Sequence, residues 1–392
     1  MMSRGGRLQQ ILTASWATLR ADSREGVAQG SAAILLGHLA RLALGLISSA
    51  LLARSLGPEG FSVFSVVGAV ATIGAVVADG GLSGSAVRLI AGDLAEQPHR
   101  AQQTVGQLVR LKLVLMALAL ALIWTLARPL AQLLNLPAGS GPTLISVAGL
   151  SLVVSNLNGL SRTLLHASRH FQAMSATQVV NVLVTLLLMV ALFVTGRLAI
   201  VPALVVGIIA GLVAALFGWR LLPAAWRMAA YNSVPPLTGQ NRELFGFARW
   251  LWLASIFWIL AAQLDLLLLN RWVAPNVAGF YALALNLYIK ADLVNDTLRT
   301  VLLPSVSTLN SKIAIHAYIR RSLVRSLLLA AVVVLALPLV RPFILTVYGE
   351  AYTPSVTVFY LFTAILLFDL LATPLLLLVY PLNLPRFIAA AD

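Results

Sequence analysis

Apolar runs of about 20 residues, separated by short polar loops, follow one another along almost the whole chain. A helix of that length, rising about 1.5 Å per residue, crosses a hydrocarbon layer of about 30 Å. Hydrophobic residues make up 60% of the 392 positions and charged residues only 10%, which is far below the share in soluble domains. The sequence therefore predicts an all-α, polytopic membrane protein with about ten transmembrane helices. We place them at residues 31–53, 61–86, 113–127, 143–165, 175–195, 199–218, 248–270, 278–303, 326–346 and 355–380.

The basic residues are unevenly distributed between the two sides of these predicted helices. The net charge is +14, which in a soluble protein would suggest a nucleic-acid partner. Here no basic run is interleaved with aromatic residues, and most arginines and lysines, Lys112 among them, fall in the loops of one side. The other side receives only Arg54, Arg128, Arg197, Arg271 and Arg341. Because cytoplasmic loops are enriched in Lys and Arg, we predict cytoplasmic termini and no nucleic-acid partner.

Motifs of enzymatic chemistry are missing from the sequence. It contains no cysteine, no Gly-x-Ser-x-Gly elbow, no His-Glu-x-x-His pair and no phosphate-cradling Gly-x-x-x-x-Gly-Lys loop. His166 and His170 are spaced like metal ligands on one helical turn, but no third ligand is near, and we interpret them as a helix end. We therefore predict no enzyme, no metal and no cofactor.

A repeated motif divides the chain into two parts. Arg54, Pro58 and Gly60-Phe61 in the first part correspond to Arg271, Pro275 and Gly279-Phe280 in the second. Both copies follow a helix of the same predicted direction, which indicates a parallel repeat of two lobes. We predict a cytoplasmic N-terminal segment at 1–26, a six-helix lobe at 27–219, a cytoplasmic linker at 220–247 and a four-helix lobe at 248–392. Gly207 and Gly211 are interpreted as helix packing within the first lobe.

The segments 50–65 and 78–91, ALLARSLGPEGFSVFS and ADGGLSGSAVRLIA, resemble the opening signature of a family of membrane transporters. This is the polysaccharide-export and Wzx-type lipid-linked oligosaccharide flippase family, of the multidrug/oligosaccharidyl-lipid/polysaccharide exporter superfamily. The proline in 303–307 is similar to one at the inner end of the family's eighth helix. The resemblance implies a bacterial cytoplasmic membrane protein. Such flippases have six helices in each lobe, so the four-helix second lobe predicts a truncated chain.

Charged residues inside the predicted helices are the candidates for function. Each would cost roughly 3 kcal/mol at the bilayer centre, so most must face protein or a watered cavity. We predict that four of the polar residues line a cavity and bind the pyrophosphate group of the substrate. They are Arg41, Lys290, His38 and Asn286. Four acids are candidates for coupling to Na⁺ or H⁺: Asp79, Asp265, Asp292 and Asp369. The alternative is internal ion pairing, for instance of Asp292 or Asp296 with Arg299. For Asp79 the alternative is a pair with Arg88.

Three functions remain compatible with these features. The first is a flippase that moves a polyprenyl-pyrophosphate-linked oligosaccharide across the membrane by alternating access, with that lipid-linked substrate and membrane lipids as partners. The second is a cation-coupled drug or metabolite exporter of the same superfamily. The third is a membrane-embedded glycan polymerase or glycosyltransferase, which is disfavoured because the predicted outer loops are short. The glycan, the driving ion and the oligomeric state are left open.

Overall fold

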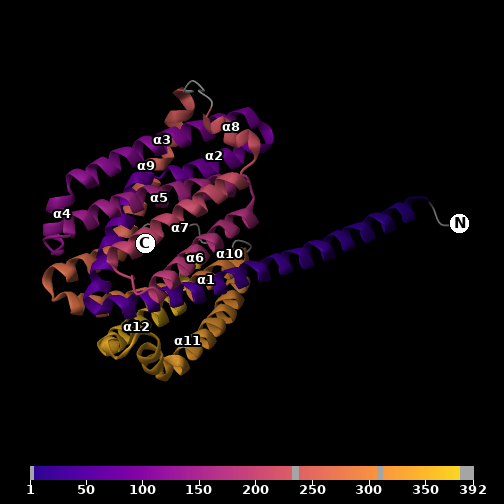
Figure 1. The fold of residues 1–392 in the computed structure, drawn as a ribbon. Helices are drawn as coiled ribbons and strands as arrows, with labels where there is room; N and C mark the ends of the chain where they lie inside the picture. The colour runs from indigo at the N-terminus through magenta and orange to yellow at the C-terminus, as the bar shows by residue number, and fades with distance from the viewer. Residues whose placement is uncertain (1–3, 232–237, 307–311, 380–392) are drawn as a thin grey trace.

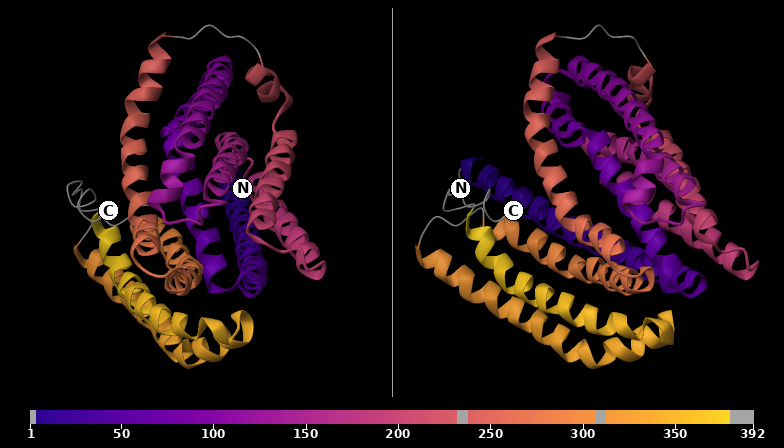
Figure 2. Two further views of the ribbon diagram at one scale, coloured as in Figure 1. Left: turned by 60° about the vertical axis from the view of Figure 1, so that its left-hand side comes forward. Right: turned by 90° about the vertical axis from the view of Figure 1, so that its left-hand side faces the viewer.

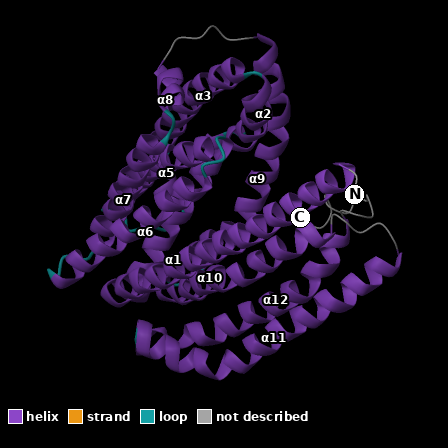
Figure 3. Cartoon of the chain, turned by 90° about the vertical axis from the view of Figure 1, so that its right-hand side faces the viewer, coloured by secondary structure: helices purple, strands orange, loops and turns teal. Residues whose placement is uncertain are grey.

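The computed structural model describes residues 4–231, 238–306 and 312–379, and the side chains of the first helix from Leu42 onward. Helices joined by short loops make up this part of the chain, and no strand occurs in it (Figure 3). The helices are α1 Arg4–Asp79, α2 Leu82–Glu96, α3 Pro98–Thr125, α4 Ala127–Leu133, α5 Gly141–Ala167, α6 Phe171–Val194, α7 Ile200–Leu221, α8 Ala224–Tyr231, α9 Thr238–Trp272, α10 Pro275–Val306, α11 Lys312–Tyr348 and α12 Thr353–Leu376, with two 3₁₀ turns, η1 Glu350–Tyr352 and η2 Leu377–Val379. The all-α prediction is confirmed.

Eight described helical segments are long and apolar enough to cross a membrane. One of them, Leu42–Asp79, runs through two of the ten predicted spans without a loop between them. The predicted span 278–303 corresponds to α10, which is not among the eight and which carries Lys290 and Asp292. The chain is therefore a multi-pass membrane protein. The described residues give eight candidate spans where we expected ten, because a kink joins two expected spans into one helix and because α10, with Lys290 and Asp292, is not counted as a span.

The kink in α1 replaces the loop that the turn-forming residues SLGPEG suggested. Gly57 alone leaves helical geometry, with φ 64° and ψ 178°, and Pro58 begins the second arm of α1. Only glycine adopts this backbone conformation readily, because it lacks a Cβ. Proline is tolerated in the first turn of a helix because its missing N–H has no partner there anyway. One residue is therefore enough to bend the chain between two helical arms.

The predicted span 61–86 is wrong at its C-terminal end. Helix α1 stops at Asp79, and Gly80 and Gly81 both adopt left-handed conformations with φ 60° and 68° before α2 begins. A Cβ on Gly81 would lie 2.2 Å from the main-chain oxygen of Ala248 in α9. The two glycines therefore both end the helix and let α9 approach the turn closely.

Helix α1 contacts helices of both halves of the chain (Figures 1 and 2), while its N-terminal part extends beyond the other helices in Figure 1. It packs against α5 and α6 on one side and against α9 and α10 on the other. Helices α11 and α12 pack on one another and, through α12, on α10. One large hydrophobic core includes Val66 and Val67 of α1, Ile145 of α5 and Leu283 of α10, each buried completely. The core thus joins the two halves of the chain.

The two copies of the repeated motif contact one another, at Pro58 of the first copy and Gly279 of the second. Gly279 lies against Pro58, so closely that a Cβ on Gly279 would be 2.0 Å from the Pro58 oxygen. Arg54 donates from Nε to the Val347 oxygen at the end of α11, at 2.9 Å. Arg271, its counterpart, donates to the Gln132 oxygen of α4, at 3.2 Å. Each arginine therefore contacts the other half of the chain, while the superposition of two lobes stays a prediction.

The predicted linker 220–247 contains helical structure. Helix α8 lies inside it and packs on α3, and α9 begins at Thr238, ten residues before the predicted span. The packing prediction for Gly207 and Gly211 is confirmed at Gly211, where a Cβ would lie 2.6 Å from Cγ1 of Val154 in α5. This close approach joins α7 to α5 within the N-terminal helices.

Candidate functional site

A cavity of about 440 Å³ lies between helices of the two halves of the chain and is called the central cavity below. Both arms of α1 contribute to its wall, with Gly45 and Ser49 before the kink and Phe64 and Thr72 after it. Helices α6, α9 and α10 complete the wall. The cavity is therefore lined by helices from both sides of the predicted linker, the position at which transporters built from two repeats bind their substrates.

Lys290 is the one charged side chain among the described residues that line the central cavity. Its Nζ donates to the side-chain oxygen of Asn286, one turn earlier on α10, and to the Asn286 main-chain oxygen at 3.5 Å. A Cβ on Gly45 would lie 3.8 Å from Cε of Lys290, an ordinary van der Waals distance, so the lysine stem passes beside α1. The structure therefore places Lys290 and Asn286 together in the wall of one cavity, and their role in binding substrate stays a prediction.

Uncharged polar side chains form the rest of the polar wall, and sequence reasoning missed them. They are Ser48, Ser49, Ser65, Thr72, Thr185 and Gln263. Ser49 shares a 3.0 Å hydrogen bond with the hydroxyl of Tyr348, and Thr185 donates to the Asn181 oxygen at 2.8 Å. The available signal was spacing: Ser65 and Thr72 are seven residues apart and lie on one face of a helix. Hydroxyl groups cost little inside a helix because they can bond to its own carbonyls.

The side chains of His38 and Arg41 lie outside the part of the chain that the structure describes. Their backbone belongs to α1, and Arg41 precedes Gly45 by one helical turn. Residues four apart in a helix share a face, so Arg41 remains a prediction for the same wall.

Two of the four predicted acids each face a tyrosine of α10. The hydroxyl of Tyr281 donates to Asp265 of α9, which also accepts from the Leu266 N–H at 2.7 Å. The hydroxyl of Tyr288 donates to Asp369 of α12 at 3.4 Å. Both tyrosine rings contact the ring of Phe362, at centroid distances of 5.4 and 5.1 Å. The C-terminal helices therefore hold two carboxylates on one aromatic cluster, and neither lines the central cavity.

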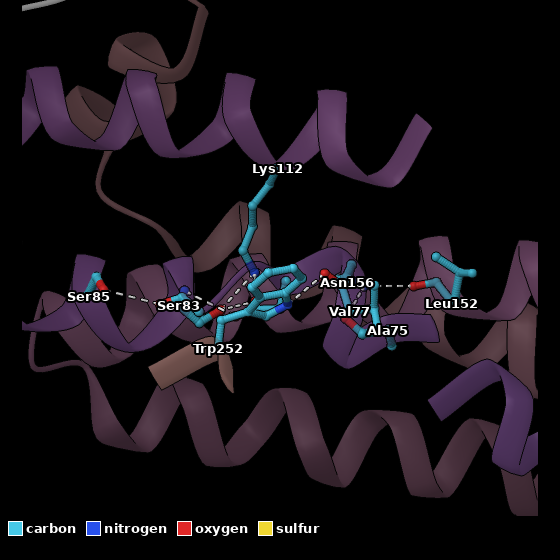
Figure 4. A network of polar contacts seen from close by, with 10 residues as sticks. Ala75, Val77, Ser83, Ser85, Lys112, Leu152, Asn156 and Trp252 are labelled. Atoms are coloured by element: carbon cyan, nitrogen blue, oxygen red, sulfur yellow. Dashed lines mark hydrogen bonds and ion pairs between the residues drawn. The ribbon is translucent and has the colours of Figure 1, made fainter. Parts of the chain in front are cut away.

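Asp79 is part of a separate polar network near the turn at Gly81. Its Oδ1 lies 2.6 Å from Nζ of Lys112, and Ser83 accepts from the same ammonium at 2.7 Å and donates to Asp79 at 2.6 Å. Figure 4 shows Lys112 pointing from α3 to Ser83 beside Trp252, whose Nε1 donates to the Val77 oxygen at 3.1 Å. The Lys112 side chain is 1% exposed. Our assignment of Lys112 to a loop was therefore wrong, and its partner is the acid that we had paired with Arg88.

Asp292, the fourth predicted acid, lies half-buried on α10, two residues beyond Lys290. It is not among the residues that line the central cavity. Of the eight predicted site residues, the structure thus brings Lys290 and Asn286 into the cavity and distributes the acids over three other places.

Known structures with the same fold are membrane transporters. An inward-facing multidrug resistance MATE family transporter of the MOP superfamily matches with a TM-score of 0.61 and 14% identity, over 86% of this chain and 84% of that one. The lipid II flippase MurJ, in an inward closed conformation, matches with a TM-score of 0.66 and 13% identity, over 88% and 75%. The eukaryotic MATE transporter AtDTX14 matches with a TM-score of 0.56 and 13% identity, over 88% and 83%. At these identities the likeness concerns the fold.

The chain thus has the fold of these transporters, one of which belongs to the MOP superfamily, with a cavity between its two halves. Residues 27–310 match the family model described as polysaccharide biosynthesis protein. The match covers more than half of the sequence, so the chain belongs to the polysaccharide biosynthesis protein family. A search of curated protein sequences finds no significant match.

Proposed function

We propose that this protein is a flippase that carries a polyprenyl-pyrophosphate-linked oligosaccharide across the bacterial cytoplasmic membrane, with its N-terminus in the cytoplasm. The observation that carries the proposal is Lys290 in the central cavity, where it is the one charged residue of the described wall. An ammonium surrounded by hydroxyl and amide groups suits a diphosphate, which accepts charge-assisted hydrogen bonds. Family membership supports a glycan-related substrate.

A proton or Na⁺ is the proposed coupling ion, with Asp265 and Asp369 as its carriers. Both carboxylates accept from tyrosine hydroxyls of α10, the helix that also holds Lys290. Intramembrane carboxylates are costly and serve as ion or proton sites in pumps. A change of ion occupancy at either acid would act on α10, and so on the wall of the central cavity.

Replacing Lys290 by glutamine is expected to weaken the binding of farnesyl pyrophosphate at least tenfold. Hydrogen bonds to a charged group contribute about 1.5–3 kcal/mol, and about 1.4 kcal/mol corresponds to a factor of ten. Isothermal titration of the full chain in nanodiscs measures this, and Lys290→Arg should retain most of the affinity. Arg341→Gln, which removes an exposed positive charge outside the cavity, is the matched control. Equal affinity of wild type and Lys290→Gln would contradict the proposal.

Arg41 is expected to contribute a second positive charge. In a strain that lacks its glycan flippase, the variant Arg41→Lys should restore part of the surface glycan and Arg41→Ala none, because a guanidinium stays charged and an alanine cannot replace it. Surface-glycan staining measures the activity, and an immunoblot measures the amount of protein in the membrane. Full complementation by Arg41→Ala at normal abundance would show that the charge is dispensable.

A further inference from the structure

A second cavity, of about 270 Å³, opens beside the central cavity and is called the side cavity below. It lies among α1, α5, α6 and α7. Phe64 and Thr72 line both cavities. The two cavities are therefore neighbours, the central one at Lys290 and the side cavity among the N-terminal helices.

The described wall of the side cavity combines apolar and polar side chains and carries no charge. Ser151, Ser155 and Asn158 of α5 and Asn181 of α6 supply hydroxyl and amide groups, and none of the described lining residues is charged. The side-chain oxygen of Asn158 is buried without a hydrogen-bond donor among the described atoms. A buried acceptor without a donor is costly, so such an atom indicates a missing partner that can donate a hydrogen bond.

The two glycines of the Gly207 and Gly211 motif line this cavity and differ in their surroundings. At Gly211, the close contact with Val154 brings α7 against α5. At Gly207, a built Cβ would meet no atom within 4 Å, so the missing side chain leaves open space next to the polar wall. Packing therefore explains one glycine of the motif, and the side cavity explains the other.

We propose that the side cavity binds an uncharged glycosyl group of the substrate while the anionic end of the same molecule contacts Lys290. The inference rests on the flippase function proposed above and adds a sugar subsite to it. Sugar hydroxyls both donate to and accept from Asn and Ser side chains, and one of them would supply the donor that Asn158 lacks. Phe64 offers an apolar face to the C–H face of a pyranose ring. A cation would require carboxylates, which the described wall lacks, and a prenyl chain would leave the buried oxygen of Asn158 without a donor.

The test compares four probes on the full chain in nanodiscs. They are farnesyl pyrophosphate and the farnesyl-pyrophosphate-linked forms of glucose, galactose and N-acetylglucosamine. In the wild type, at least one sugar-bearing probe is expected to bind at least tenfold more tightly than farnesyl pyrophosphate. Asn158→Ala removes the buried acceptor and Gly207→Val fills the space. Both variants should bind the sugar-bearing probe no more tightly than farnesyl pyrophosphate. Their affinity for farnesyl pyrophosphate itself should equal that of the wild type.

Val205→Phe is the matched control, because it enlarges a side chain that is 38% exposed on the same helix, two residues from Gly207. Val205→Phe should still bind the sugar-bearing probe at least tenfold more tightly than farnesyl pyrophosphate. The sugar subsite is overturned if no sugar-bearing probe binds more tightly than farnesyl pyrophosphate, or if this tighter binding survives in both Asn158→Ala and Gly207→Val. Failure of the flippase proposal looks different: farnesyl pyrophosphate itself then binds with no dependence on Lys290. Unfolding of one variant leaves the other to decide, since the two changes lie on different helices.

Discussion

Replacing Asp79 by alanine is expected to destabilise the folded protein by about 3–5 kcal/mol, because it leaves the buried ammonium of Lys112 without its counter-charge. The Lys112 side chain is 1% exposed, whereas that of Asp79 is 25% exposed. Lys112→Met should therefore cost less than Asp79→Ala, since the carboxylate that remains can still contact water. The midpoint of thermal denaturation in detergent measures both changes.

The double variant Asp79→Ala/Lys112→Met should recover most of the lost stability, because it removes both charges together. Asp93→Ala is the matched control. The ion pair of Asp93 with Arg100 is longer, at 3.9 Å, and its side chains are 23% and 41% exposed, so its loss should cost less than about 1 kcal/mol. A double variant as unstable as Asp79→Ala would show that the network acts through its hydrogen bonds and not through the ion pair.

The second large effect is expected at Gly279. A methyl group there would lie 2.0 Å from the Pro58 oxygen and 2.6 Å from its carbonyl carbon. These are backbone atoms next to the kink of α1, so they cannot move away as a flexible side chain would. Overpacking costs typically about 1–3 kcal/mol and occasionally more. We expect Gly279→Ala to lower the free energy of unfolding by about 3 kcal/mol or more. The midpoint of thermal denaturation should therefore fall by several degrees.

Gly92→Ala is the control for the general effect of alanine in a helix. Gly92 lies in α2, and a Cβ there would meet no atom within 4 Å. Alanine has the higher helix propensity by about 1 kcal/mol, so this variant should be neutral or more stable. If Gly279→Ala were as stable as Gly92→Ala, the close packing of the two repeated motifs would be refuted.

Hydropathy was sufficient to predict the helical class and the positions of most spans, because a spanning helix requires a long apolar run whatever its neighbours are. Hydropathy was not sufficient to predict where the helices bend and where they end. Gly57 bends α1 with a single residue, and Gly80-Gly81 end it inside a predicted span. Whether a glycine bends, ends or continues a helix depends on the helices around it, and the sequence pattern alone does not contain that information.

The candidate site was predictable only where charge marked it. Lys290 and Asn286 attract notice in an apolar helix, and they lie together in the central cavity. Thr185 and Gln263 line the same cavity, yet nothing in their own helices distinguishes them from ordinary polar residues. Lys112 was misplaced for the opposite reason: a lysine at the edge of an apolar run looks like a loop charge until Asp79 is brought to it by the packing of α3 on α1.

The bend at Gly57 joins two arms of α1: the first arm bonds to α11, and the second arm bonds to helices of both halves of the chain, α5 and α9. Before the bend, Gly45 lies beside Lys290 of α10 and Ser49 bonds to Tyr348 of α11. After the bend, the Ala75 oxygen accepts from Asn156 of α5 at 3.0 Å. Glycine resists changes of its backbone angles less than any other residue, so we expect any change in the angle between the two arms to occur at Gly57. Both arms line the central cavity, so a change in the angle between them at Gly57 would change the shape of the cavity around Lys290.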